Sequence, residues 1–179
     1  MRARFALQVF AAWSAVFLLS PAAVAEDGYE LWLRYHSVEA PQLESYRLAA
    51  TQLVGDTGSP VIKAAADELR RGLSGLLAAA LPSANHPTRD GAIIFGTTKS
   101  SPTIASLHLD LRPAGPEGFL IRSISVDGRR ATVIAGNDEI GVLYGVFNFL
   151  RLIQTRRPID SLSLVSAPCS VRTPAPNSC

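Results

Sequence analysis

The sequence predicts an α/β domain in which helices pack on a mixed sheet. Two stretches with helical spacing, over residues 59–81 and 137–155, separate short apolar segments that are typical of buried strands. Helices between strands favour parallel pairing, and a tight turn at Asp127-Gly128 adds an antiparallel pair. With 179 residues and 47% hydrophobic content, the chain is long enough for one packed core and too apolar to be disordered.

Two strands are expected before the first helix. Residues 29–35 place four apolar side chains at every second position, which is the period of a strand. These are Tyr29, Leu31, Leu33 and Tyr35. Residues 46–54 form a second candidate strand, which ends at the turn Gly55-Asp-Thr-Gly58.

The first long helix is expected to begin at Ser59 and to stop at Pro82. Ser59 supplies an N-cap hydroxyl, and Pro60 suits the first helical turn. The apolar residues recur at helical spacing. They are Ile62, Ala65, Leu69, Leu73, Leu76 and Ala80. A loop is expected over residues 83–90.

A buried strand over 91–96 and a short helix over 102–109 are expected next, with a capping segment, Thr97 to Ser101, between them. Strands over 118–126 and 130–135 flank the Asp127-Gly128 turn, a strong hairpin signal.

The second long helix is expected to be capped by Asn137 and to run to about Thr155. Its first turn carries Asp138 and Glu139, where negative charge suits the helix dipole. Residues 162–165 are expected to form a final strand.

Residues 1–25 have the pattern of a secretory signal peptide. Arg2 and Arg4 precede the apolar stretch Phe5–Leu19, and Ala23-Val-Ala25 offers a small-x-small cleavage site. The apolar stretch is shorter than the about 20 residues that a membrane span needs. We therefore expect an exported product, periplasmic or extracellular, that leaves the membrane after cleavage.

Charge and length exclude several classes of function. Without the two leader arginines, basic and acidic residues balance at 15 each, and no basic block is present. This balance argues against nucleic acid or an anionic membrane surface as a partner. A (β/α)₈ barrel of roughly 250 residues does not fit in the chain, so no activity that needs such a barrel is expected here.

No catalytic, cofactor-binding or metal-binding residue is expected. The acidic pairs Asp67-Glu68 and Asp138-Glu139 suggest general acid–base chemistry, but neighbours in a helix point about 100° apart and do not converge on one bond. The histidines are scattered without the spacing of a zinc site. They are His36, His86 and His108.

Two glycine-containing turns suggest phosphate binding only weakly. Gly55–Gly58 and Gly96–Ser101 lack the Gly-x-x-x-x-Gly-Lys-Ser/Thr pattern, and the sequence has no Gly-x-Ser-x-Gly elbow. Ordinary turn and cap usage explains both segments.

Gly141, Gly145 and Leu152 form a strip along the second long helix. Two glycines inside a helix cost about 1 kcal/mol each relative to alanine, so something is expected to approach this backbone closely. A neighbouring element of the same domain is the favoured interpretation, and a surface for a further domain is the alternative.

Five segments carry a resemblance to a known family. They are Glu26–Tyr35 (with Tyr-Glu-Leu-Trp-Leu-Arg-Tyr), 64–77, 101–107, 135–155 and 162–168. Together, and in this order, they resemble the N-terminal domain of bacterial α-glucuronidases of glycoside hydrolase family 67. The helix at 135–155 also resembles N-terminal domains of β-hexosaminidases, and the opening motif favours the α-glucuronidases.

The resemblance implies a domain that precedes a catalytic (β/α)₈ barrel. The enzymes it resembles remove 4-O-methyl-D-glucuronic acid from xylo-oligosaccharides by inversion, a reaction that needs two carboxyl groups about 6.5–9.5 Å apart. Glucuronoxylan-derived oligosaccharides would then meet the barrel and not this domain. No catalytic or uronate-binding position of the family has a counterpart here, so no site residue is transferred.

The sequence departs from the family after Pro168. Residues 169–179 are polar and proline-rich and contain Cys169 and Cys179, which are able to pair after export. We expect a frameshift or premature stop, a domain over 26–168 with a disordered tail, and a chain that is inactive alone. The bare barrel-facing surface is expected to drive self-association. A stand-alone carbohydrate-binding module and an accessory domain that docks on a separate barrel remain alternatives.

Overall fold

The computed structural model describes residues 34–55 and 58–167, and its compact unit begins at Tyr35. The expected leader, the tail at 169–179 and most of the strand expected at 29–35 lie outside these residues. Arg34 and Tyr35, at the end of that expected strand, belong to no helix or strand.

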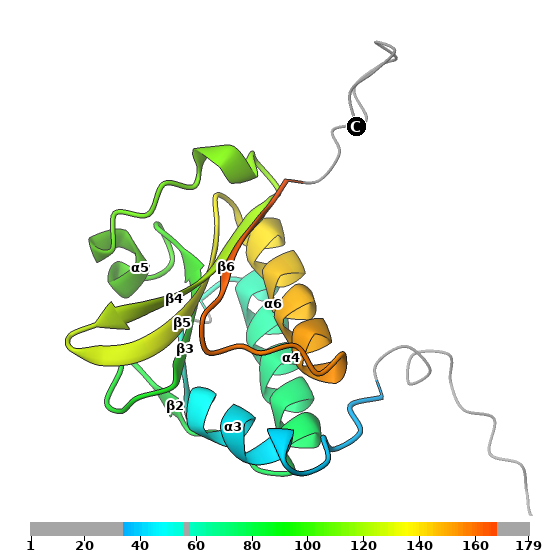
Figure 1. Ribbon diagram of the computed structural model, residues 1–179. Helices are drawn as coiled ribbons and strands as arrows, with labels where there is room; N and C mark the ends of the chain where they lie inside the picture. The colour runs from blue at the N-terminus through cyan, green and yellow to red at the C-terminus, as the bar shows by residue number, and fades with distance from the viewer. Residues whose placement is uncertain (1–33, 56–57, 168–179) are drawn as a thin grey trace, which may run out of the picture. The chain divides into compact units, whose positions relative to one another are not determined.

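A six-stranded mixed sheet forms the centre of the domain, as predicted (Figure 1). Its spatial order is β2-β1-β3-β5-β4-β6, with β2, β1, β3 and β5 parallel and β4 antiparallel to both of its neighbours. The strands are β1 (Gln52–Val54), β2 (Ser83–Ala84), β3 (Ala92–Thr97), β4 (Phe119–Val126), β5 (Arg129–Gly136) and β6 (Ser163–Ser166).

Helices cover both faces of this sheet. They are α3 (Gln42–Ala49), α4 (Pro60–Leu77), α5 (Pro102–Ser106) and α6 (Glu139–Gln154), with a 3-10 turn at Arg112–Ala114. Figure 1 shows α4 and α6 on one face and α5 on the other. No helix in the described part of the chain is long and apolar enough to cross a membrane.

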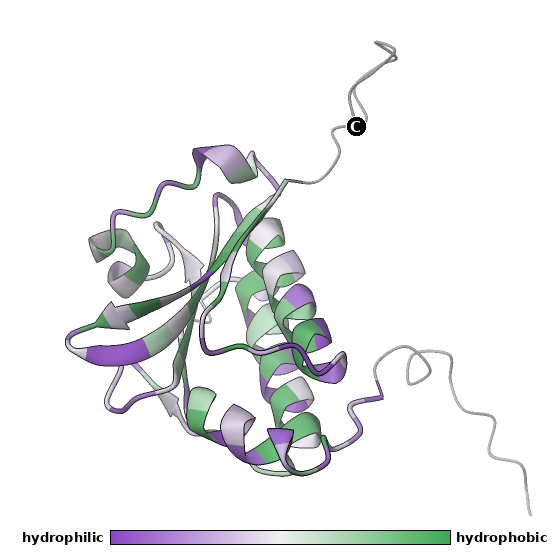
Figure 2. Ribbon diagram, viewed as in Figure 1, coloured by the Kyte–Doolittle hydropathy of each residue, from purple (hydrophilic) through white to green (hydrophobic). Residues whose placement is uncertain are grey.

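Alternation along the strands divides the core between the two faces. In β3, Ile93 and Phe95 join the larger cluster under α4 and α6, whereas Ala92 and Ile94 join the smaller cluster around Ile104 of α5. Both sets are buried because a central strand is covered on both faces. Figure 2 shows hydrophobic residues along α4 and α6 and hydrophilic ones near the tip of the β4–β5 hairpin.

The hairpin and two helix starts confirm the expectations from sequence. Asp127 and Gly128 both have positive φ (51° and 76°), as the tight turn between β4 and β5 requires. The hydroxyls of Ser59 and Ser101 accept hydrogen bonds from the backbone N–H groups of Ile62 and Ile104, which caps α4 and α5.

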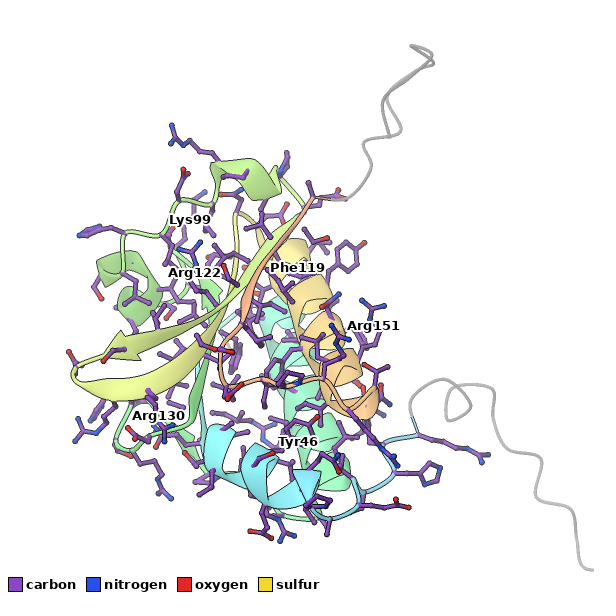
Figure 3. The ribbon with its side chains drawn as sticks, viewed as in Figure 1. Tyr46, Lys99, Phe119, Arg122, Arg130 and Arg151 are labelled. Carbon is purple, nitrogen blue, oxygen red and sulfur yellow. The ribbon has the colours of Figure 1, made fainter. Side chains whose placement is uncertain are left out.

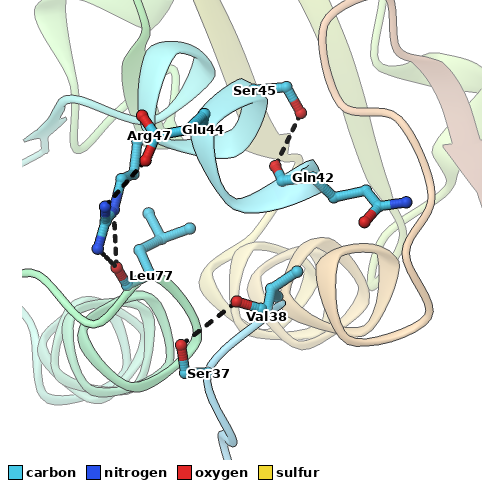
Figure 4. Close-up of polar contacts among 7 residues, drawn as sticks. All are labelled: Ser37, Val38, Gln42, Glu44, Ser45, Arg47 and Leu77. Carbon is cyan, nitrogen blue, oxygen red and sulfur yellow. Dashed lines mark hydrogen bonds and ion pairs between the residues drawn. The ribbon is translucent and has the colours of Figure 1, made fainter. Parts of the chain in front are cut away.

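The strand expected over 46–54 was wrong in its first half, where α3 forms instead. The Tyr46 hydroxyl donates to the carbonyl oxygen of Arg157 at 2.8 Å. The guanidinium of Arg47 donates to the carbonyl oxygen of Leu77 at 2.9 and 3.1 Å, as Figure 4 shows. These contacts span 111 and 30 residues, so a local pattern cannot reveal them.

The long helix α4 ends at Leu77, earlier than the stop expected at Pro82. Ala78 takes a left-handed conformation with φ 49°, and its N–H bonds to the carbonyl oxygen of Gly75. A Cβ at Gly75 would lie 2.5 Å from the carbonyl oxygen of Tyr35. The close passage of Tyr35 and the bonds from Arg47 to Leu77 therefore set this end.

Three smaller expectations also need correction. The loop expected over 83–90 contains the two-residue strand β2, which pairs in parallel with β1. The helix expected over 102–109 stops at Ser106, and His108 has a φ of 48°. The cap of α6 is Asp138 and not Asn137.

Candidate functional site

The carboxyl ends of three parallel strands meet at one edge of the sheet. The chain leaves β1 and β5 toward the face of α4 and α6, and it leaves β3 toward the face of α5 (Figure 1). Ligands of open α/β sheets bind in the crevice that such a divergence creates. This carboxyl-edge hollow is therefore the first candidate for a functional site.

The carboxyl-edge hollow has a volume of about 390 Å³. It brings together the ends of both glycine-containing turns considered in the sequence and the acidic start of α6. Its lining residues are Gly58, Ser59, Thr97, Lys99, Ser100, Asn137, Asp138 and Glu139.

Most polar side chains in this hollow hold the backbone in place. The Ser59 hydroxyl accepts from the N–H of Ile62 at 3.1 Å. The Ser100 hydroxyl accepts from the N–H of Thr97 at 2.9 Å, and the Thr97 hydroxyl accepts from Lys99 and Ser100 N–H groups. Turn and cap usage is confirmed for Gly96–Ser101, whereas Asp56 and Thr57 of the other turn lie outside the described residues.

Asp138 takes the capping role that was expected of Asn137. The Asp138 carboxylate accepts from the N–H of Gly141 at 2.8 Å and so caps α6. The Asn137 amide instead donates to the carbonyl oxygens of Leu111 and Gly115, at 2.8 and 2.7 Å. Asn137 therefore fastens the segment after α5 to the start of α6.

The other acidic pair faces basic and phenolic partners. Lys63 and Arg70 both donate to the Asp67 carboxylate, and these bonds hold the pKa of Asp67 below its ordinary value. Tyr35 and Arg71 both donate to the buried Glu68. The two carboxylates thus bind separate partners and do not face each other across a common cleft.

The three histidines lie on the surface. His36, His86 and His108 are all exposed, and in residues 34–55 and 58–167 no three His, Cys, Asp or Glu side chains gather to hold a metal ion. Both cysteines lie outside the described residues.

A neighbour within the same domain explains the glycine strip on α6. A Cβ at Gly141 would lie 2.2 Å from the carbonyl oxygen of Gly118, and a Cβ at Gly145 would lie 2.7 Å from Ile134. Leu152 packs against the larger core cluster. Strands β4 and β5 therefore take the place that the alternative interpretation gave to a further domain.

Two pairs of large apolar side chains remain exposed on α6 and β6. Tyr144 and Phe147 of α6 are 45% and 38% exposed, and Leu164 and Val165 of β6 are 38% and 46% exposed. Gly118 lies against both elements. A Cβ added at Gly118 would lie 2.4 Å from the carbonyl oxygen of Ser166 in β6, and a Cβ added at Gly141 of α6 would lie 2.2 Å from the carbonyl oxygen of Gly118.

Two similar proteins carry the name α-glucuronidase A. A probable α-glucuronidase A of Aspergillus niger is 29% identical over 142 residues, which cover 78% of this chain and 16% of the fungal protein. The α-glucuronidase A of Aspergillus tubingensis is also 29% identical over 142 residues, with the same shares covered. This chain thus spans about a sixth of the length of these curated relatives.

A solved structure and a family model complete the comparison. The structure is that of a family GH115 4-O-methyl-α-glucuronidase with specificity for decorated arabinogalactans. It has a TM-score of 0.46 and 26% identity, and the match covers 58% of this chain and 13% of that one. The model of the glycosyl hydrolase family 67 N-terminus matches residues 31–149. This match covers most of the mixed sheet and its helices, and the chain therefore belongs to the glycosyl hydrolase family 67 N-terminal domain family.

Proposed function

We propose that this chain is the non-catalytic N-terminal domain of an α-glucuronidase and is inactive by itself. The enzyme would remove 4-O-methylglucuronic acid side groups from xylo-oligosaccharides during xylan breakdown, with its reaction centre in a separate barrel. The family match over residues 31–149 is the observation that carries this proposal.

Three of the carboxylates singled out in the sequence support the inactive part of the proposal. Inverting glycoside hydrolysis requires one carboxyl group to protonate the leaving oxygen and a second to activate water from the other side of the sugar. Asp138 caps α6, and Asp67 and Glu68 bind basic residues on α4. None of these three is free to serve as such an acid or base.

The apolar residues on α6 and β6 support a docking role. We propose that Tyr144, Phe147 and Leu164 meet the catalytic barrel in the intact enzyme, because exposed aromatic and aliphatic side chains of this size mark interaction surfaces. Leu164 pairs with Ile121 and so lies on the α6 face of the sheet, whereas Val165 pairs with Leu120 and lies on the other face. In the isolated chain the same surface would cause self-association. Xylan-derived oligosaccharides would contact the barrel.

Export forms a further part of the proposal. Residues 1–25 would direct the chain to the periplasm or the medium and be removed before Glu26. N-terminal sequencing of the secreted product tests this directly, and a product that retains Met1 would contradict it.

A turnover assay tests the central proposal. Purified chain is incubated with 4-O-methylglucuronic acid-substituted xylo-oligosaccharides, and released uronic acid is measured against a blank without protein. We expect no release, whereas a full-length family 67 α-glucuronidase serves as the positive control. Release clearly above the blank would place a reaction centre in this chain and refute the proposal.

Light scattering tests the docking surface. The wild-type chain is expected to associate, and replacing Phe147 and Leu164 by serine is expected to reduce the association. Leu48→Ser is the matched control, since Leu48 is a 70% exposed leucine on α3. A wild-type chain that stays monomeric at high concentration would contradict this role.

A further inference from the structure

A second hollow lies at the opposite, amino edge of the sheet. It has a volume of about 330 Å³, near the lower end of the range for small-molecule sites. The end of α3, the half of the β4–β5 hairpin nearest its turn and residues 159–160 enclose it. Its lining residues are Leu48, Ala49, Gly91, Ser123, Ile124, Ser125, Arg130, Ala131, Thr132, Ile159 and Asp160.

Thr132 presents an unused hydroxyl to this amino-edge hollow. Thr132 is only 4% exposed, and its hydroxyl makes no hydrogen bond to any described residue. No fully enclosed side-chain oxygen or nitrogen in the described part of the chain lacks a partner, so the Thr132 hydroxyl must open onto the hollow. The Thr132 hydroxyl is therefore reached from the hollow, and no described residue of the fold uses it.

Register explains why the polar groups gather here. Thr132 pairs with Ser123 and Arg130 pairs with Ser125 across the hairpin. All four side chains therefore point to the same face as Ile121 and Ile134, which lie in the cluster under α6. The pairing of β4 with β6 stops at Arg122 and Ser163. Beyond this point, the hollow lies between this face of the hairpin and the end of α3.

The remaining groups differ in how far the fold uses them. Ser123 is committed, because its hydroxyl accepts from the N–H of Leu162 at 2.9 Å. The hydroxyl of Ser125 makes no bond to a described residue. Arg130 donates through Nε to the Asp90 carboxylate at 3.3 Å, and its two terminal nitrogens bond to no described residue. Figure 3 shows Arg130 at the hairpin end of the sheet, beside α3.

Asp160 and Ile159 complete the wall. Asp160 adds an exposed carboxylate, and its only bond to a described residue is a long one of 3.4 Å from the Ser161 hydroxyl. Ile159 is 2% exposed and gives the hollow an apolar side. A ligand that fits these walls needs an anionic group for Arg130, hydroxyls for Asp160, Ser125 and Thr132, and a compact ring.

We propose that the amino-edge hollow binds a single acidic pyranose unit, a hexuronate. The carboxylate would pair with the free nitrogens of Arg130, because a guanidinium offers a planar fork that matches carboxylate geometry. Ring hydroxyls would donate to Asp160 and exchange hydrogen bonds with Ser125 and Thr132. This binding goes beyond the proposed function, since it gives the domain its own sugar contact independent of the barrel.

Amide NMR of the full chain tests the proposal with D-glucuronate as the probe. We expect saturable shifts confined to the amides of residues 123–125, 130–132 and 159–160, with a dissociation constant on the order of 1 mM. Methyl glucoside tests the need for the carboxylate and inorganic phosphate tests the need for the ring. If methyl glucoside or phosphate causes the same shifts with equal affinity, the proposal is overturned. The absence of saturable shifts at about 50 mM glucuronate would also overturn it.

Two variants connect the shifts to named groups. Arg130→Gln is expected to weaken binding by about tenfold or more, whereas the matched control Arg129→Gln, whose side chain lies on the opposite face of the hairpin, leaves it unchanged. Thr132→Val keeps the shape and removes only the hydroxyl, and it is expected to weaken binding severalfold.

Wild-type affinity in both variants would overturn the proposal. Turnover plays no part in this readout, so an inactive chain that binds glucuronate supports both proposals, and one that binds nothing refutes this proposal alone.

Discussion

The two hollows at opposite edges of one sheet use their polar side chains in different ways. At the carboxyl edge, Ser59, Thr97 and Asp138 each bond to a backbone N–H at the start of a helix or turn. At the amino edge, the hydroxyls of Ser125 and Thr132 bond to no described residue. The first hollow is thus built from groups that hold the fold, and the second contains groups that the fold does not need.

This difference can be measured as stability. A group that satisfies a backbone donor should cost free energy of unfolding when it is removed, because the donor loses its partner. A hydroxyl that makes no bond within the fold and only opens onto a hollow should cost little or nothing when it is replaced by a methyl group of the same shape. Variants at the two edges should therefore differ in the stability that they lose.

The largest loss is expected for Gly141→Ala, at the first turn of α6 on the carboxyl edge. The added Cβ would lie 2.2 Å from the carbonyl oxygen of Gly118 and 3.1 Å from its carbonyl carbon, and both atoms belong to backbone that cannot move aside cheaply. We expect a loss of about 3 kcal/mol or more in the free energy of unfolding, measured in urea. Asn148→Ala on the same helix is the control, and an equal, small effect of both would show that α6 can shift away from β4.

The helix cap should give the next largest effect. Asp138→Ala removes the acceptor for the N–H of Gly141 and a negative charge at the start of α6, and about 1–2 kcal/mol should be lost. Asp138→Asn keeps the acceptor and is expected to lose less than half as much. If the asparagine and alanine variants unfold at the same urea concentration, the hydrogen bond is not what stabilises this helix start.

The sequence predicted most of the sheet and the long helices because their signals are local. The Ser59 cap lies three residues from Ile62, the Asp127-Gly128 turn joins adjacent strands, and the period of α4 is visible in its own residues. The errors occur where a distant contact decides. Tyr46 lies in a helix, and its hydroxyl donates to the carbonyl oxygen of Arg157. Asn137 does not cap α6, because its amide donates to carbonyl oxygens more than 20 residues away.

The amino-edge hollow could not be predicted for the same reason. Its lining comes from α3, Gly91 before β3, the hairpin and the segment before β6, which are far apart in the chain. Thr132 is a β-branched residue in a strand, which is an ordinary choice, and nothing next to it in the sequence marks its hydroxyl as unused. Only the register of β4 with β5 places Thr132, Ser123 and Arg130 on one face.

Thr132→Val is expected to change stability little or to increase it. The substitution preserves the branched shape and removes a hydroxyl that no described residue contacts, so the free energy of unfolding should stay within about 0.5 kcal/mol of wild type or rise. Thr97→Val is the matched control at the carboxyl edge, where the hydroxyl accepts two backbone N–H groups and its loss should cost about 1 kcal/mol or more. A loss of that size at Thr132 would show that its hydroxyl serves the fold.

The smallest expected effect is a change in the acid titration of Asp90, which lies beside the amino-edge hollow. The backbone N–H and the guanidinium of Arg130 both donate to this carboxylate and hold its pKa below the ordinary value. A lowered pKa means that the bonds stabilise the folded state above the ordinary pKa, and that this stabilisation is lost as the pH falls through the lowered one. In Arg130→Gln the backbone N–H remains, so the pKa of Asp90 should rise only part of the way, as measured by carboxyl NMR.

Asp110 is the control in the same sample. Hydrogen bonds from Arg112 lower the pKa of Asp110 to about 2, and its titration should not change. An unaltered Asp90 beside an unaltered Asp110 would mean that the Arg130 side chain is already free of its internal partner, and the whole guanidinium would then be open to a ligand.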